Sequence, residues 1–425
     1  MKEFDRIIGY EPIKNELKRI CDILVNPDKY KKFGVRAPQG LLLYGEPGVG
    51  KSLMADCFIK ASKRKAYVFR KVKMGEDFVE SISKLFEEAK KNAPSIILLD
   101  DMDKFANEDE EHRDAPEYVA IQACIDYLKK SDVFVVATAN DIKSFPESLV
   151  RVGRFSKCIE IERPEGKDCE QIMQHYLSKK KHVGKFDYAE FAKTLNGMTC
   201  AELESIINEA GIYAAYEGKE KIGKDEMIRA CMRVMYKAPE DSLSFSKNPN
   251  EIKRLAYHEA GHVVVAEVLN DESISLVSIA SHLGSIGGVT KNYFDDDKCW
   301  INHDFRIGSV KRVLGGKAAT EVVFGEIDLG AESDIGIAFH RVEGLVDEGV
   351  MLGFENYSSR SDGDGKRDRI SDLVAKEVEK IYQDTKRILI DNREFLDKIA
   401  NALIERTTLL MSDVQEIKKT CKLVR

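Results

Sequence analysis

Residues 40–52, GLLLYGEPGVGKS, place the pattern GxxxxGK[ST] between an apolar run and the amphipathic stretch SLMADCFIKA. The glycines of such a loop let backbone N–H groups turn inward and surround phosphate. The side chain of Lys51 then reaches the β- and γ-phosphates, and the Ser52 hydroxyl binds Mg²⁺. A glycine-rich turn that arises by chance has no need of the strand before it or the helix after it. We therefore predict a nucleotide-binding loop whose contacts come from Gly45, Glu46, Pro47, Gly48, Val49, Gly50, Lys51, Ser52 and Leu53.

Three further apolar runs have the same character as GLLLYG. They are AYVFRKV at residues 66–72, SIILLDD at 95–101 and VFVVATA at 133–139, and long amphipathic stretches separate them. Alternation of buried strands with helices is typical of a parallel sheet that has helices on both faces. We therefore expect residues 1–160 to form an α/β nucleotide-binding domain.

The rest of the chain is mainly helical in pattern. Helical periodicity runs through the segments between residues 164 and 236 and predicts a small helical domain at 161–236. Residues 237–250, KAPEDSLSFSKNPN, have little periodicity and predict a linker. We expect a mainly helical domain at 251–425, with a strand-like insert at 274–294.

Polar residues follow two of the predicted strands. Asp100 is placed to hold Mg²⁺, and Asp101 and Asn140 are placed to orient the attacking water. In RVGRF, Arg151 and Arg154 can stabilise charge on a transferring phosphoryl group, often from a neighbouring subunit. We expect these arginines to have no charge partner at the nucleotide site of their own subunit. The alternatives are acids that cap strand ends and arginines that lie on the surface.

The helical stretch RLAYHEAGHVVVAEVL at residues 254–269 contains HExxH. Residues four apart lie on one face of a helix, so His258 and His262 can present two nitrogens to one zinc ion. Glu259 lies beside the metal, where it can take a proton from water. A pair of helical histidines is, however, more often structural. A catalytic zinc also needs a third ligand, and the residues alone leave His282, His303, His340 and many acids open.

The stretch GSIGGVTKNYF at residues 284–294 follows glycines and predicts a strand. Such a strand can pair with an extended substrate through backbone hydrogen bonds, which gives weak sequence specificity. A purely structural edge strand is an equally good interpretation.

Composition limits the classes of protein that remain. The 425 residues are 43% hydrophobic and carry a net charge of −7, which argues against a general nucleic-acid binder. Nine scattered cysteines without a CxxC pair argue against a disulfide framework. No signal peptide or membrane-spanning run is evident, so we expect a cytoplasmic protein that meets a membrane only if an anchor precedes this sequence.

A resemblance extends over nearly the whole chain. GEPGVGKS, IILLDDMDKF, ATAND, LVRVGRF, AYHEAGH, VLGGKAATEVVFG and LGAESDI occur in the order found in FtsH-type proteins, which are AAA+ ATPases fused to a zinc metallopeptidase. The resemblance implies an adenine pocket near Gly9 and a homo-hexameric ring in which Arg151 and Arg154 act across the subunit boundary. It also implies that Asp334, in GAESDI, is the third zinc ligand, which leaves His340 an ordinary histidine.

Three departures from the family pattern matter. Asp101 stands where most members have Glu, so its shorter carboxylate predicts slow ATP hydrolysis. The segment KVKMGEDFVESISKLFEEAKKNAP is about eight residues short of the usual pore-loop region. It has no clear aromatic-glycine pair, which leaves Met74 or Phe78 as a substitute. The membrane-spanning segments typical of the family do not occur in the sequence.

Together these features predict an ATP-dependent zinc metalloendopeptidase that unfolds and degrades proteins, with zinc, ATP and magnesium as cofactors. One alternative is an ATP-driven remodeller whose peptidase is a relic. The other is an ATP-independent peptidase whose nucleotide domain only holds the ring together.

Overall fold

Two compact units make up the chain in the computed structural model. One contains residues 1–181 with 196–207, and the other contains 182–195 with 208–425. The predicted boundaries at residues 160, 236 and 250 stay predictions. The residues described are 1–35, 37–70, 78–105, 115–151, 153–181, 183–238, 248–280, 287–293, 302–325, 332–348, 351–352 and 364–425, without the side chains of 364–368.

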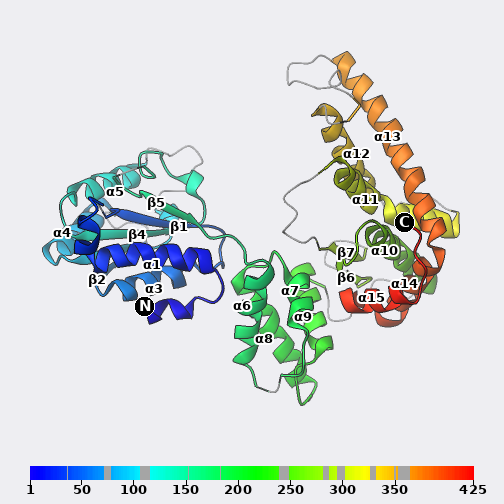
Figure 1. The fold of residues 1–425 in the computed structure, drawn as a ribbon, viewed down its shortest axis with the longest axis horizontal. Helices are drawn as coiled ribbons and strands as arrows, with labels where there is room; N and C mark the ends of the chain where they lie inside the picture. The colour runs from blue at the N-terminus through cyan, green and yellow to red at the C-terminus, as the bar shows by residue number, and fades with distance from the viewer. Residues whose placement is uncertain are drawn as a thin grey trace. The chain divides into compact units, whose positions relative to one another are not determined.

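A five-stranded parallel sheet forms the centre of the first unit (Figure 1). The strand order is β2-β3-β4-β1-β5, so the nucleotide-binding loop after β1 leaves an inner strand. All four predicted strands are present, whereas β5 was not predicted because its run KCIE is short and half polar. The strands are β1 (Gly40–Tyr44), β2 (Lys65–Phe69), β3 (Ser95–Leu99), β4 (Val133–Ala139) and β5 (Lys157–Glu160).

Both faces of this sheet are covered by helices, as predicted. Alternate side chains of a strand point to opposite faces, and on one face Phe134 of β4 packs against Phe58 of α3. On the other face Val133, Val135 and Ala137 join the core formed with α4 and α5. The α/β prediction is therefore confirmed. The helices of this region are η1 (Lys2–Arg6), α1 (Glu11–Val25), α2 (Pro27–Lys31), α3 (Lys51–Ser62), α4 (Phe78–Lys91), η2 (Met102–Lys104), α5 (Pro116–Tyr127) and η3 (Ile142–Ser144).

Between β5 and α10 the described residues form four helices, where periodicity predicts a helical domain. Their apolar positions recur at helical spacing, which lets each helix bury one side. The bounds are α6 (Gly166–Ser178), α7 (Tyr188–Leu195), α8 (Cys200–Tyr216) and α9 (Lys224–Tyr236).

The C-terminal region is mainly helical, as predicted, with a small antiparallel sheet of order β7-β6-β8. Strands β6 (Ile274–Ser278) and β7 (Val289–Asn292) occupy the predicted insert, while β8 (Thr408–Leu410) comes from far along the chain and was not predicted. The helices are α10 (Pro249–Leu269), α11 (His303–Phe324), α12 (Glu332–Asp347), α13 (Asp364–Asp391), α14 (Arg393–Arg406) and α15 (Met411–Lys419).

Helices α10 and α11 approach each other closely at a pair of glycines. A Cβ atom at Gly261 would lie 2.2 Å from the carbonyl oxygen of Gly315, which no side chain tolerates. This contact brings the α11 backbone against the face of α10 that carries the histidines. Among the residues that the structure describes, no helix has the length and apolar character needed to cross a bilayer.

Candidate metal centre and nucleotide site

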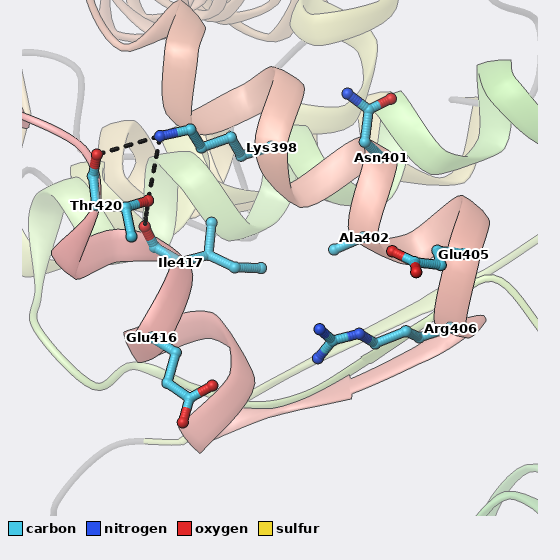
Figure 2. A pocket seen from close by; sticks show the side chains of 8 residues that line it. All are labelled: Lys398, Asn401, Ala402, Glu405, Arg406, Glu416, Ile417 and Thr420. Atoms are coloured by element: carbon cyan, nitrogen blue, oxygen red, sulfur yellow. Dashed lines mark hydrogen bonds between the residues drawn. The ribbon is translucent and has the colours of Figure 1, made fainter.

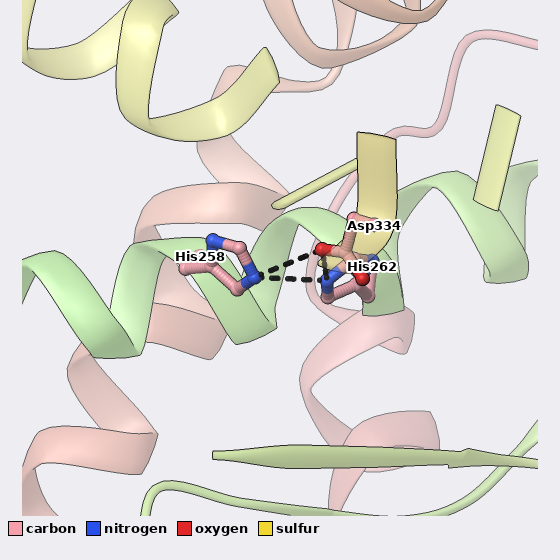
Figure 3. Close-up of side chains that lie close together, drawn as sticks. All are labelled: His258, His262 and Asp334. Carbon is pink, nitrogen blue, oxygen red and sulfur yellow. Dashed lines mark hydrogen bonds and ion pairs between the residues drawn. The ribbon is translucent and has the colours of Figure 1, made fainter. Parts of the chain in front are cut away.

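Three side chains converge in the C-terminal region (Figure 3). His258 and His262 lie one turn apart on α10, and their Nε2 atoms are 3.2 Å from each other. Asp334 comes from the first turn of α12, and its Oδ2 is 3.3 Å from each of these nitrogens. The three donor atoms therefore form a nearly equilateral triangle.

This triangle fits zinc. A zinc ion about 2.0–2.1 Å from each ligand in a tetrahedron places the ligand atoms about 3.3 Å apart. Two imidazole nitrogens and one carboxylate oxygen are also a donor set that zinc takes in catalytic sites, where a fourth position stays open. The side chains are 12%, 14% and 19% exposed, so the centre is sheltered but accessible.

Backbone groups of α11 orient the histidines. The Nδ1 atom of His262 lies 2.7 Å from the carbonyl oxygen of Arg312, which can only accept a hydrogen bond. That contact places the proton on Nδ1 and leaves the Nε2 lone pair for a metal. At Gly316, a Cβ atom would lie 2.5 Å from His258 Nε2 and 2.6 Å from His262 Nε2. Glycine at this position therefore keeps open the space into which both nitrogens point.

Among the candidates that the structure describes, Asp334 is the one that lies beside the two histidines. Burial alone would raise the pKa of Asp334, but hydrogen bonds from His258 and His262 outweigh it and hold that pKa well below its usual value. His303 and His340 are both exposed and His303 faces Asp304, while His282 lies outside the described residues.

Glu259 follows the first histidine on α10, as HExxH requires. Its side chain is buried, with 4% of the residue exposed. A buried carboxylate beside a metal position has the placement expected of a general base.

The nucleotide-binding loop has the predicted form, between β1 and α3. Gly48 and Gly50 have φ angles of 86° and 104°, which are left-handed conformations that favour glycine. Lys51 Nζ donates to the carbonyl oxygens of Gly45 at 2.7 Å and Glu46 at 2.8 Å, and to Asn140 Oδ1 at 3.0 Å. Burial lowers the pKa of Lys51, while the nearby acids Asp103, Asp101 and Asp100 act in the opposite direction.

The two acids after β3 have different surroundings. Asp100 is buried, and its Oδ1 accepts a hydrogen bond from Thr138 at 2.7 Å while its Oδ2 accepts one from Arg70 Nε at 2.8 Å. Asp101 has a left-handed φ of 54°, and its Oδ2 lies 2.8 Å from Lys104 Nζ. Thr138 and Arg70 were not predicted, because their contacts with Asp100 join three different strands.

Asn140 is held between Lys51 and a further acid, Asp103. Its Nδ2 donates to Asp103 Oδ2 at 2.8 Å, while its Oδ1 accepts from Lys51. Because lysine only donates and an ionised carboxylate only accepts, both neighbours require the same orientation of the amide. Sequence reasoning missed Asp103, although it lies in the same acidic stretch, LLDDMDKF, as Asp100 and Asp101.

The two arginines of RVGRF differ sharply. Arg151 is exposed. Arg154 is 8% exposed and donates to Asp126 at 2.8 Å, to Gln122 at 3.0 Å and to the carbonyl oxygen of Ser148 at 2.6 Å. The charge partner, Asp126, belongs to α5 and is not one of the predicted nucleotide-site residues, so the expectation that the two arginines lack a partner at the nucleotide site of their own subunit stays a prediction.

The remaining predicted residues have mixed placements. Glu46 accepts a hydrogen bond from Arg163 Nε at 2.8 Å. Gly9 is buried, with a left-handed φ of 68°. Phe78 begins α4 and packs against Phe69 and Phe105, so it is a partly buried member of an aromatic cluster, and its use as a pore residue stays a prediction. Met74 lies outside the described residues. Pro47, Ser52 and Leu53 are exposed and Val49 is buried.

A pocket lies between α14 and α15, and none of the residues that line it is a predicted site residue (Figure 2). Lys398 Nζ donates to the carbonyl oxygen and to Oγ1 of Thr420, both at 3.1 Å, and thereby fixes the end of α15. The lining residues are Lys398, Asn401, Ala402, Glu405, Arg406, Glu416, Ile417 and Thr420.

Comparison with known proteins gives a family match for each of the two regions that carry the candidate sites. Residues 41–163 match the AAA family, ATPases associated with various cellular activities, and residues 246–417 match peptidase family M41. The chain is 30% identical to the ATP-dependent zinc metalloprotease FtsH 2 of Thermoanaerobacter sp., over 97% of this chain and 82% of that protein. The chain belongs to the FtsH family.

Other FtsH proteins agree with this assignment. The chain is 31% identical to the ATP-dependent zinc metalloprotease FtsH of Thermus thermophilus, over 97% of this chain and 70% of that protein. It is also 31% identical to FtsH 2 of Phytoplasma mali, of whose length it spans 63%. The predicted family and fold are confirmed. Zinc, ATP and magnesium are the cofactors that the FtsH assignment implies, and proteins are the substrates of FtsH-type proteases.

Proposed function

We propose that this chain uses ATP hydrolysis to move polypeptide and cuts that polypeptide at the centre formed by His258, His262 and Asp334. The observation that supports this most directly is the convergence of three donor atoms, 3.2–3.3 Å apart, beside buried Glu259. A structural histidine pair has no need of the carboxylate from α12 or of the open space at Gly316.

Each residue of the metal centre has a distinct role in this proposal. His258, His262 and Asp334 hold the zinc, which when bound acts as a Lewis acid toward a peptide carbonyl and lowers the pKa of water. Glu259 is the general base, and its carboxylate takes the proton of the attacking water. It then returns that proton to the leaving amine nitrogen, so that one carboxylate serves both steps.

The nucleotide site supplies positioning and charge. Lys51 exchanges its contacts with the carbonyls of Gly45 and Glu46 for phosphate oxygens, while Ser52 and Asp100 hold Mg²⁺. Asn140 Oδ1, held in one orientation by Asp103, accepts a hydrogen bond from the attacking water, and Asp101 assists. Gly9 contributes to the adenine pocket.

The working assembly in this proposal is a homo-hexamer. Exposed Arg151 can act on the nucleotide of the neighbouring subunit. Arg154 instead supports the segment that carries Arg151, through its contacts with Asp126 and the carbonyl of Ser148. Sedimentation of the purified chain is expected to show a ring-sized species, and a monomer with full ATPase activity contradicts the assembly.

A second candidate function has specific support. Asp101 has a short side chain, and its Oδ2 lies 2.8 Å from Lys104 Nζ. Phe78 is partly buried in an aromatic cluster. Both observations favour weak coupling between ATP and substrate, as in a peptidase whose nucleotide domain only holds the ring together. The remodeller with a relic peptidase is less favoured, because the donor set of the metal centre is intact.

One preparation distinguishes these functions. Casein degradation is measured with ATP, with a non-hydrolysable ATP analogue and with a zinc chelator. Degradation that needs ATP and stops with chelator is the expected result. Equal degradation with ATP and with the analogue selects the ATP-independent peptidase, while ATP hydrolysis without degradation selects the remodeller.

A further inference from the structure

The hydrogen bond that holds Glu259 comes from the sheet and not from its own helix. Thr290 Oγ1, on β7, donates to Glu259 Oε2 at 2.7 Å. Strand β7 is one of the two edge strands of the three-stranded sheet among the described residues. The side chain proposed as the base is thus tied to the strand proposed to pair with substrate.

The approach of β7 to Glu259 depends on a glycine. A Cβ atom at Gly288 would lie 2.5 Å from Glu259 Cγ and 2.5 Å from the carbonyl oxygen of Ser278. No side chain fits there, so the backbone just before β7 contacts the aliphatic part of Glu259 directly. Two residues later, on the same face, Thr290 reaches the carboxylate. Lys291, on the opposite face, donates instead to the carbonyl oxygen of Thr194 at 2.8 Å.

We propose that Thr290 is a positioning residue for peptide cleavage, which acts by fixing the carboxylate of Glu259. Its hydroxyl donates a hydrogen bond to Oε2, so Oε1 is the oxygen that takes the proton from water and returns it to the leaving amine. A glutamate side chain has several rotatable bonds, so a second contact is needed to hold its carboxylate in one place. A displacement of about 1 Å at a catalytic group costs as much as about 10²-fold in rate.

The arrangement also links substrate and base. If the edge of β7 pairs with an extended peptide, one strand sets the position of the scissile carbonyl through its backbone and the position of the base through Thr290. Binding and chemistry then share one rigid element, which is how precise sites are built. This inference rests on the proposed peptidase function.

A purely structural role for Thr290 predicts different behaviour. If its hydroxyl only satisfied a buried carboxylate, its loss would leave that group unpaired and lower the stability of the fold, as removal of one partner of a buried hydrogen bond does. A positioning role predicts in addition a fall in kcat at nearly constant KM with the zinc content preserved, whereas a purely structural role leaves the kcat of the folded protein unchanged.

The test compares Thr290→Val, which keeps the shape but loses the donor, with Thr290→Ser, which keeps the donor. Cleavage of a short fluorogenic peptide by the full chain gives kcat and KM, and metal analysis and thermal melts are run on the same samples. We expect Thr290→Val to lower kcat about 10- to 100-fold, as loss of a supporting contact does. Thr290→Ser is expected to restore most of the rate, with one zinc per chain in each variant.

Two controls separate chemistry from binding. Thr385→Val removes a fully buried hydroxyl that donates to the carbonyl of Ile381 within α13, and it is expected to leave kcat unchanged. In the Glu259→Gln background, Thr290→Val is expected to leave the affinity for uncleaved peptide unchanged. A loss of affinity there would make Thr290 a substrate-binding residue and overturn the positioning role.

Other outcomes also decide. A wild-type kcat for Thr290→Val overturns the inference, and so does a Thr290→Ser variant that is as impaired as Thr290→Val and melts earlier. A wild-type chain that binds zinc but cleaves neither peptide nor casein overturns the proposed function itself, and this inference with it.

Discussion

The metal centre and the nucleotide site hold their charged groups in opposite ways. At the metal centre, His258, His262 and Asp334 point their donor atoms at one another and at one shared position. At the nucleotide site, Lys51 is bonded to Asn140 and to loop carbonyls, and the acids that follow β3 are paired with basic side chains of their own chain. The first arrangement is ready for its ion, whereas the second must exchange partners.

The difference follows from what each site binds. Three donors that meet at about 3.3 Å are already at the spacing of a tetrahedral ion, so little rearrangement opposes binding. A nucleotide with its Mg²⁺ brings large charges of both signs, and the protein's own pairs must open to receive them. Variants of the metal centre are therefore expected to show large, local effects. Variants of the nucleotide site are expected to affect either ATP turnover or the stability of the fold, depending on the residue.

The largest effect is expected at Glu259. Glu259→Gln removes the proton acceptor without removing a zinc ligand, so peptide cleavage is expected to fall by up to about 10⁴-fold. Zinc content and ATPase activity are expected to stay at the wild-type level. Gln keeps the shape of Glu259, and in our proposal this side chain binds neither the zinc ion nor the nucleotide. Metal analysis and ATP turnover on the purified variant check this. Loss of zinc in Glu259→Gln would make this residue part of the donor set.

The next prediction separates the two arginines. Arg151→Ala is expected to lower the kcat for ATP about 10³-fold, the magnitude typical of an arginine that stabilises phosphoryl transfer. Its melting temperature is expected to stay unchanged, because Arg151 is exposed. ATP turnover and thermal melts of the two variants are compared, and equal loss of turnover at equal stability would return both arginines to the same role.

Arg154→Ala is the matched variant. Its guanidinium is bonded to Asp126, so its loss is expected to cost about 1–2 kcal/mol of folding free energy. Arg154 holds the pKa of Asp126 at about 2, below the ordinary 3.8. The stability from this pair is therefore present above about pH 4 and lost as pH falls toward 2. The difference between Arg154→Ala and wild type is expected to shrink over that range.

A smaller effect is expected at Gly316. A Cβ atom there would lie 2.5–2.6 Å from the Nε2 atoms of both histidines, so Gly316→Ala is expected to weaken zinc binding about 10- to 100-fold. Gly344→Ala, on α12, is the control, since a Cβ atom there would meet nothing within 4 Å. Zinc affinity is measured by competition with a chromogenic chelator. Equal zinc affinities of Gly316→Ala and Gly344→Ala would contradict this prediction and would mean that α11 can shift away from α10 to accommodate the added Cβ atom.

Features set by local spacing could be predicted from the sequence. The loop at residues 45–52 is recognisable because its glycines, strand and helix are neighbours in the chain. His258 and His262 are recognisable because one helical turn brings them together. Asp334, on a different helix, came only from the family resemblance, since no spacing rule connects it to α10.

Features set by tertiary contact could not be predicted. The ion pair of Arg154 with Asp126 joins the loop after β4 to α5, and Thr290 reaches Glu259 across from β7. Strand β8 was missed because TLL at residues 408–410 becomes a strand only by pairing with β6. In each case the deciding partner lies far away in the sequence, where neither periodicity nor composition gives information about it.

The smallest expected effect tests partner exchange at the nucleotide site itself. Arg70 binds Asp100 Oδ2 through Nε at 2.8 Å, so it is expected to compete there with the Mg²⁺ that we propose Asp100 to hold. Its side chain is 64% exposed, so the pair contributes at most about 1 kcal/mol, or about fivefold in an equilibrium. Arg70→Gln is expected to lower the Mg²⁺ concentration for half-maximal ATP turnover by up to that factor, with a difference that shrinks as salt is added. Arg229→Gln, which breaks the exposed pair with Glu217, is the control. A higher Mg²⁺ requirement in Arg70→Gln would show that Arg70 helps to hold phosphate. Asp100 would then not need to exchange a partner when Mg²⁺ binds, and the contrast with the metal centre would not hold for this residue.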